Sequence, residues 1–150
     1  MDNRLRKIII GLAILGLLVS IYMTIYKVTN NEAMCIGSGG CSVVNASRYS
    51  EVNGIPVALI GVGGYAAILA LLFLERRPGF FQENGTMLLF GVSLVGFLFT
   101  LYLIVVEVFF IKAYCPFCLT SQAVMTIIFI LSVTRLIKQP QFQEDLNAPY

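Results

Sequence analysis

The four cysteines of this 150-residue chain fall into two pairs, and the second pair has the spacing of an exchangeable disulfide. Cys115 and Cys118 form a C-x-x-C motif around Pro116 and Phe117. This spacing lets two sulfur atoms meet across one turn at the start of a helix, where unpaired backbone N–H groups stabilise a thiolate and lower its pKa. Pro116 suits such a first turn, because the N–H that proline lacks would have no partner there. We therefore expect a reactive dithiol.

The first pair, Cys35 and Cys41, is separated by the glycine-rich stretch Ile-Gly-Ser-Gly-Gly, which can bend freely. A mobile disulfide can be attacked by the thiol of another protein and then re-formed by exchange with a fixed partner. This spacing predicts an outer shuttle at Cys35 and Cys41 and an inner acceptor at Cys115 and Cys118. A bridge between Cys35 and Cys41 that only staples the loop remains an alternative.

A metal site built from all four cysteines is a further alternative. Zinc ligands usually come in closely spaced pairs, and the five residues between Cys35 and Cys41 exceed the common gap of about two to four. The chain has no histidine, which excludes a histidine ligand and a histidine general base. We expect no metal, and the four-cysteine structural site stays as the competing interpretation.

The segments that position these cysteines are strongly apolar. Hydrophobic residues make up 58% of the chain and charged residues 12%, which argues against a water-soluble fold. Four stretches, 8–27, 55–74, 86–111 and 115–136, have the length of about 20 residues that spans a bilayer, and lipid forces such stretches to be helical. The sequence predicts an all-α integral membrane protein with a four-helix membrane domain over 1–137, its first helix a retained anchor.

Positive charges indicate the orientation, because Lys and Arg near membrane helices are retained in the cytoplasm. With both termini inside, the cytoplasmic flanks hold seven cations and the outer flanks three: Arg4, Arg6, Lys7, Arg76, Arg77, Arg135 and Lys138 against Lys27, Arg48 and Lys112. All four cysteines then lie on the periplasmic or extracellular face, which permits disulfides. The polar tail over 138–150 is expected to be disordered and cytoplasmic.

An electron acceptor must lie next to Cys118, which sits at the lip of the apolar region. A lipid-soluble quinone is the economical choice, since it can reach a helix bundle from within the bilayer. Glu107 precedes Cys115 by eight residues, or about 12 Å along a helix. An ionisable group there is a candidate for protonating a reduced quinone. A glutamate that merely reaches the outer headgroups is an equal alternative.

The chain resembles the vitamin K epoxide reductase family in its prokaryotic form. The resemblance covers residues 8 to 135 and rests on Cys35, Gly40-Cys41, Ser47, Tyr49, Gly54-Ile-Pro56 and Cys115-Pro-Phe-Cys118. It implies a four-helix bundle around a quinone, capped by an outer loop with a short helix near residues 41–48. It also implies that Cys35 exchanges with a partner protein, that Cys41 relays electrons to Cys115, and that Cys118 and Ser47 lie beside the quinone. For Ser47 an ordinary capping role is the alternative.

Three features depart from relatives in the family. Many prokaryotic members carry a fused thioredoxin-like domain that this chain is too short to hold, which implies a separate thioredoxin-fold partner of the DsbA-like kind. Ser42 stands where bacterial relatives often have Asp. Gln122 stands where vertebrate members have a Tyr that helps to bind the naphthoquinone.

The predicted function is that of a membrane thiol-disulfide oxidoreductase in the inner membrane. It reoxidises a thioredoxin-fold partner and passes electrons through Cys35, Cys41, Cys115 and Cys118 to ubiquinone or menaquinone, which supports disulfide formation. Ser47 and Glu107 are the expected supporting residues, and no nucleic acid is involved. A DsbB-type quinone-linked oxidase and a non-catalytic membrane protein with a structural metal site are the alternatives.

Overall fold

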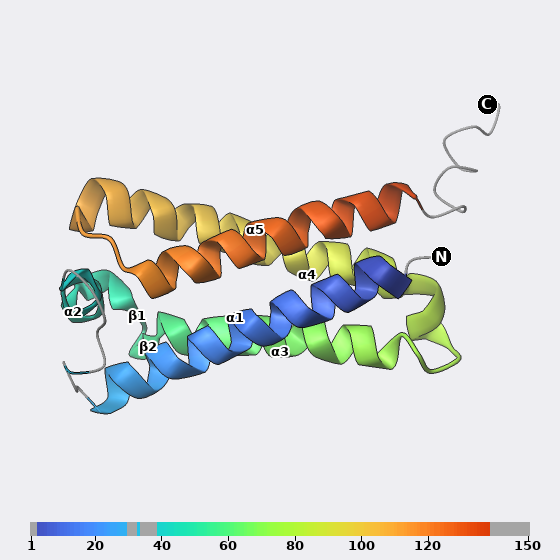
Figure 1. Ribbon diagram of the computed structural model, residues 1–150, viewed down its shortest axis with the longest axis horizontal. Coiled ribbons are helices and arrows are strands. Elements are labelled where there is room, and N and C mark those ends of the chain that lie inside the picture. Colours follow the sequence, from blue (N-terminus) through green and yellow to red (C-terminus); the bar gives the residue numbers. More distant parts are fainter. Residues whose placement is uncertain (1–2, 30–32, 34–38, 139–150) are drawn as a thin grey trace.

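Four long helices form the body of the protein (Figure 1). The computed structural model describes residues 3–29, 33 and 39–138. The long helices are α1 (Asn3–Thr29), α3 (Val57–Leu74), α4 (Phe80–Val105) and α5 (Pro116–Ile137), and α4 continues into the π-helix η3 (Val106–Ile111). Each helix runs in the opposite direction to the one before it (Figure 1). The predicted all-α, four-helix membrane bundle is confirmed.

The helices close into a ring and turn apolar side chains outward. α1 packs against α3 and α5, and α4 packs against the same two helices. All four are long and apolar enough to cross a membrane, yet only 17% to 28% of the residues in their most apolar windows are buried. Leu18, Phe73 and Val95 are among the exposed apolar residues. Helices that are apolar on every side, in a bundle that buries so few of their residues, fit a hydrocarbon environment. The protein is a multi-pass membrane protein.

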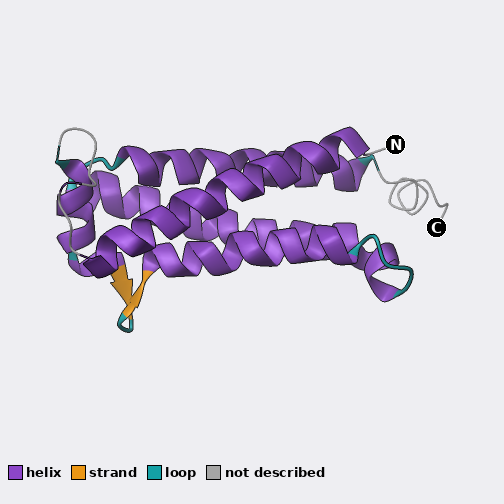
Figure 2. Ribbon diagram, turned by 60° about the horizontal axis from the view of Figure 1, so that its bottom comes forward, coloured by secondary structure: helices purple, strands orange, loops and turns teal. Residues whose placement is uncertain are grey.

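The connection between α1 and α3 builds a small cap at one end of the bundle. It contains helix α2 (Gly40–Ala46), the 3₁₀ turn η2 (Arg48–Ser50) and the strands β1 (Glu51–Val52) and β2 (Ile55–Pro56). Asn53 and Gly54, with φ of 53° and 83°, form the turn of this antiparallel hairpin. Two positive φ values at an Asn-Gly pair are characteristic of a type I′ turn. Figure 2 shows the hairpin projecting from the cap end.

The two ends of the bundle differ in what they carry. α2 and the start of α5 lie at the cap end, whereas the start of α1, the turn between α3 and α4, and the end of α5 lie at the opposite end (Figure 1). The predicted tail lies outside the described residues from position 139 onward. At the opposite end, the Arg135 guanidinium of α5 is ion-paired with the Glu75 carboxylate, which follows α3.

Tyr65 of α3 joins three helices in the core. Its ring lies so close to Gly16 of α1 that a Cβ atom at position 16 would overlap it. Its hydroxyl donates to the carbonyl oxygen of Ser121 in α5 at 2.8 Å and contacts the Ser121 hydroxyl at 3.0 Å. A buried phenol needs such a partner, so the contact fixes α3 and α5 relative to one another.

Candidate active site

Three of the four cysteines meet at the cap end. Cys115 is fully buried, Cys41 is 1% exposed, and both belong to one apolar cluster with Met23 and Tyr26 of α1. Cys118 packs against the same cluster. Cys35 lies outside the described residues, so its predicted exchange with Cys41 remains a prediction.

The surroundings of the Cys115 sulfur favour its thiolate form. The hydrogen bond from the Cys118 thiol is the largest cause of a lowered pKa at Cys115, from an ordinary 9.0 to about 6, and burial opposes it. The backbone N–H groups of Cys118 and Phe117 and the thiol of Cys41 also donate to this sulfur. Cys115 is the N-cap of α5 and Pro116 occupies the first turn, as the C-x-x-C spacing predicts.

Cys41 is brought to Cys115 by close contact between backbones. Cys41 lies in the first turn of α2, directly after Gly40. A Cβ atom at position 40 would overlap the carbonyl oxygen of Tyr114, the residue before Cys115. Only glycine lets the two segments approach so closely. The Asn45 amide then donates to the Cys41 carbonyl oxygen at 3.0 Å.

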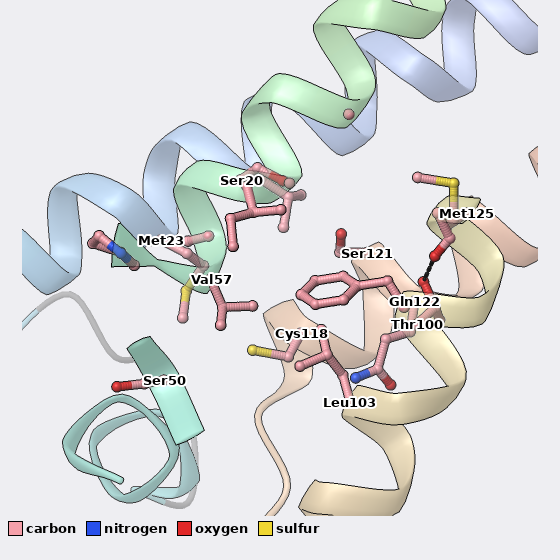
Figure 3. A pocket seen from close by; sticks show the side chains of 18 of the residues that line it. Ser20, Met23, Ser50, Val57, Thr100, Leu103, Cys118, Ser121, Gln122 and Met125 are labelled. Atoms are coloured by element: carbon pink, nitrogen blue, oxygen red, sulfur yellow. Dashed lines mark hydrogen bonds between the residues drawn. The ribbon is translucent and has the colours of Figure 1, made fainter. Parts of the chain in front are cut away.

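A cavity of about 560 Å³ opens beside Cys118 between the long helices. Its wall is mostly apolar, and it takes residues from α1, α3, α4 and α5 and from the cap. Figure 3 shows Ser20, Met23 and Val57 on one side of this space and Leu103, Cys118 and Gln122 on the other. The polar side chains in the wall are few and include Ser20, Ser47, Thr100, Glu107, Cys118, Ser121 and Gln122. A largely apolar cavity of this size with a few polar groups is typical of a small-molecule site.

Glu107 lies inside the protein, at the end of the cavity next to the cysteines. It belongs to η3 and is only 4% exposed, so it does not reach outward to the headgroups. The Gln122 amide donates to its carboxylate at 2.8 Å, and the backbone N–H of Cys115 donates as well. The sequence drew attention to Gln122 only as a departure from relatives. Its position four residues after Cys118, on the same helix face, was the signal that it belongs to the site.

The vitamin K epoxide reductase family model matches residues 7–133 of the chain, which span both the bundle and the cysteine cluster. The chain belongs to this family. It is 34% identical over 118 residues to the thiol-disulfide oxidoreductase LTO1 of Arabidopsis thaliana, an alignment that covers 75% of this chain and 31% of that protein. The chain therefore spans about a third of that relative's length.

Two serines of this vitamin K epoxide reductase family member stabilise α2. The Ser47 hydroxyl donates to the Val44 carbonyl oxygen at 2.6 Å, a capping contact at the end of α2, and Ser47 also lines the cavity. Its supporting role beside a quinone stays a prediction. The Ser42 hydroxyl donates to the Gly39 carbonyl oxygen at 2.7 Å, within the first turn of α2.

Lys27 anchors the cap of this family member to the bundle, a role that the sequence did not reveal. Its ammonium group at the end of α1 donates to the Asn45 carbonyl oxygen and, at 2.8 Å, to the Ser50 hydroxyl. It also lies 3.3 Å from a carboxylate oxygen of Glu51. The three contacts bind one cation to α2, η2 and β1, and so hold the cap over the cavity.

Two aromatic contacts fix the cap and the dithiol turn. The Tyr49 ring of η2 lies 5.5 Å from the Phe110 ring of η3, and the Tyr22 ring of α1 lies 5.0 Å from the Phe117 ring of α5. Aromatic pairs at these distances are favourable beyond the area they bury. Phe117, inside the C-x-x-C motif, thus fixes the dithiol turn against α1.

Proposed function

We propose that the protein is a membrane thiol-disulfide oxidoreductase that carries electrons from a thioredoxin-fold protein through its two cysteine pairs to a quinone. One observation carries the proposal. The sulfur of Cys115 has hydrogen bonds to Cys41, on the cap, and to Cys118, which lines the cavity. These contacts form a continuous path from the cap to the interior of the bundle. The name of the Arabidopsis relative, a thiol-disulfide oxidoreductase, is consistent with this path.

The exchange begins at the outer pair, Cys35 and Cys41. The dithiol of the partner protein reduces the disulfide between Cys35 and Cys41 and leaves oxidised. The Cys41 thiolate then attacks the Cys115 sulfur, so that the bond between Cys41 and Cys115 forms and the bond between Cys115 and Cys118 breaks. Cys35 attacks Cys41 in turn and releases Cys115. Two electrons have then moved from the outer pair to the inner pair.

The lowered pKa of Cys115 favours the last of these steps. A thiol of low pKa is a good leaving group in disulfide exchange. Cys115, whose pKa is held at about 6 chiefly by the hydrogen bond from Cys118, is released as a stable thiolate when Cys35 attacks. This property favours the reduced state of the inner pair.

The cavity fits a quinone ring. It is mostly apolar, it touches Cys118, and its wall holds Gln122 and Ser47 as polar groups that would orient the ring. When bound, a quinone such as ubiquinone or menaquinone accepts two electrons and two protons. Cys118 is the residue of the inner pair that would face it, and the burial of the site excludes water from the dithiol.

The same arrangement supports an orientation in the membrane and a place for the redox partner. The predicted cytoplasmic cations flank the end of the bundle away from α2, while the cysteine cluster lies at the cap end (Figure 1). We place the cap on the periplasmic or extracellular side, with both termini in the cytoplasm. A separate DsbA-like protein on that side would reach Cys35.

The proposal is tested with the purified protein in detergent, a short-chain quinone and a reduced thioredoxin-fold donor. We expect each of four single variants, Cys35→Ala, Cys41→Ala, Cys115→Ala and Cys118→Ala, to lose quinone reduction. We expect Cys41→Ala to accumulate a mixed disulfide between Cys35 and the donor, and Cys118→Ala still to form it. Full quinone reduction by Cys118→Ala would contradict the relay.

A further inference from the structure

Glu107 occupies an irregular turn that places its side chain inside the protein. The helix widens at η3, where the Lys112 N–H bonds to the Glu107 carbonyl oxygen, five residues back, at 2.8 Å. Such π-helical turns are rare and are frequently found at functional sites. The carboxylate that this turn directs inward is nearly fully buried, and its Oε1 atom has no hydrogen-bond partner among the described residues.

The two donors to this carboxylate lie on either side of Cys118. The Cys115 backbone N–H and the Gln122 amide both donate to Glu107. Residues 115, 118 and 122 follow one another along one face of α5, at helical spacings of three and four. A carboxyl group bonded at both ends of this row lies beside its middle member, and Glu107 and Cys118 both line the cavity.

No cation neutralises Glu107 within the part of the chain that the structure describes. Neither of the ion pairs found there includes it. The nearest titratable groups are the thiols of Cys115 and Cys118, at the start of α5, and of Cys41 on α2. Tyr49 of η2, Lys27 of α1 and Tyr65 of α3 also line the cavity. Lys27 is paired with Glu51 on the cap.

We propose that Glu107 is the proton donor to the Cys118 sulfur. When Cys41 attacks Cys115, the bond between Cys115 and Cys118 breaks, and Cys118 leaves with the electron pair as a thiolate in an apolar wall. The Glu107 carboxyl gives its proton to that sulfur and becomes a carboxylate, which Gln122 and the Cys115 N–H stabilise. When the inner pair is oxidised again, the Cys118 thiol would return this proton to the Glu107 carboxylate. A bound quinone would supply the two-electron oxidant and would take its two protons from the aqueous phase. This inference rests on the proposed relay, and it names the group that supplies the proton which the relay needs.

The test follows the internal exchange in the full chain without any quinone. Excess dithiothreitol reduces the outer pair, and acid quenching with thiol alkylation and mass spectrometry then counts the reduced Cys115 and Cys118 over time and over a range of pH. We expect Glu107→Gln, which keeps the size and the hydrogen bonds but not the proton, to slow reduction of the inner pair by about tenfold or more. We also expect Glu107→Gln to abolish one limb of the plot of this rate against pH. Glu107→Asp should restore that limb, and Glu51→Gln should match the parent.

Three results would overturn the inference. Equal rates and equal pH profiles in the parent and Glu107→Gln would remove Glu107 from the proton transfer. A uniform slowing with an unchanged pH profile would make Glu107 a positioning residue only. If Glu107→Gln does not fold, Gln122→Met takes its place, because it keeps the Glu107 carboxyl and removes the amide that binds it. The limb of the rate–pH profile must then shift along the pH axis. A limb that does not shift would also remove Glu107 from the proton transfer. A parent protein that never reduces Cys115 and Cys118 would instead refute the relay itself.

Discussion

The side chains of Cys41 and Cys115 are hydrogen-bonded to each other at the buried base of the cap, although they come from distant parts of the chain. Cys41 depends on Gly40 for this contact, and Cys115 depends on the first turn of α5. The formation of this contact therefore reports whether the cap is correctly positioned on the bundle. Three predictions concern the position of the cap and the chemistry of the cysteines, and a fourth concerns the opposite end of the bundle.

Gly40→Ala should separate the two cysteines. The added methyl group would overlap the Tyr114 carbonyl oxygen, so α2 must shift away from Cys115. Overpacking of this kind costs about 1–3 kcal/mol. We expect the trapped yield of a Cys41 to Cys115 disulfide in a Cys35→Ser, Cys118→Ser background to fall severalfold. Gly63→Ala, whose methyl group would meet nothing within 4 Å, is the matched control and should leave the yield unchanged.

The reduced protein should contain a thiolate near neutral pH. Because the hydrogen bond from Cys118 holds the pKa of Cys115 at about 6, the ultraviolet absorbance of the thiolate should rise through pH 6 in the parent. In Cys118→Ala it should rise toward pH 9 instead. Folding lowers this pKa, so the stabilisation of the reduced protein is complete above about pH 9 and is lost as the pH falls to 6. A single transition at pH 9 in the parent would contradict the hydrogen bond.

Lys27→Met should loosen the cap. It removes three contacts from one half-buried ammonium group, and hydrogen bonds to charged groups contribute about 1.5–3 kcal/mol. We expect a lower thermal midpoint in detergent and faster proteolysis within residues 39–56. Glu51→Gln loses only the exposed ion pair, worth about 0–1 kcal/mol, and should change both readings little. Equal effects of the two variants would show that the ion pair, rather than the backbone contact, holds the cap.

Glu75→Gln should destabilise the opposite end of the bundle without altering the cysteine cluster. It leaves the buried Arg135 guanidinium without its counter-charge, and breaking such a pair costs about 3–5 kcal/mol. The double variant Glu75→Leu, Arg135→Met should recover much of the loss, because no uncompensated charge remains. Thermal unfolding in detergent measures both. A double variant less stable than Glu75→Gln would mean that the ion pair is itself strongly favourable.

The sequence by itself determined the membrane character, the helical class and the number of spans. A continuously apolar stretch such as 86–111 favours a helix in lipid, because a helix bonds its backbone N–H and C=O groups within the segment. The C-x-x-C spacing likewise predicted the start of α5, because Pro116 and the two cysteines suit a first helical turn. Local chemistry and the solvent were sufficient for these features.

Only the tertiary structure decided which polar groups meet. The pairs Glu107 with Gln122, Lys27 with Ser50 and Glu75 with Arg135 depend on how each helix is rotated about its axis and on which helices are neighbours. Helices that are apolar on every face carry little periodic signal for that rotation. Small contacts fix it instead, such as Gly16 against Tyr65 and Gly40 against Tyr114, and these exist only once the bundle has formed.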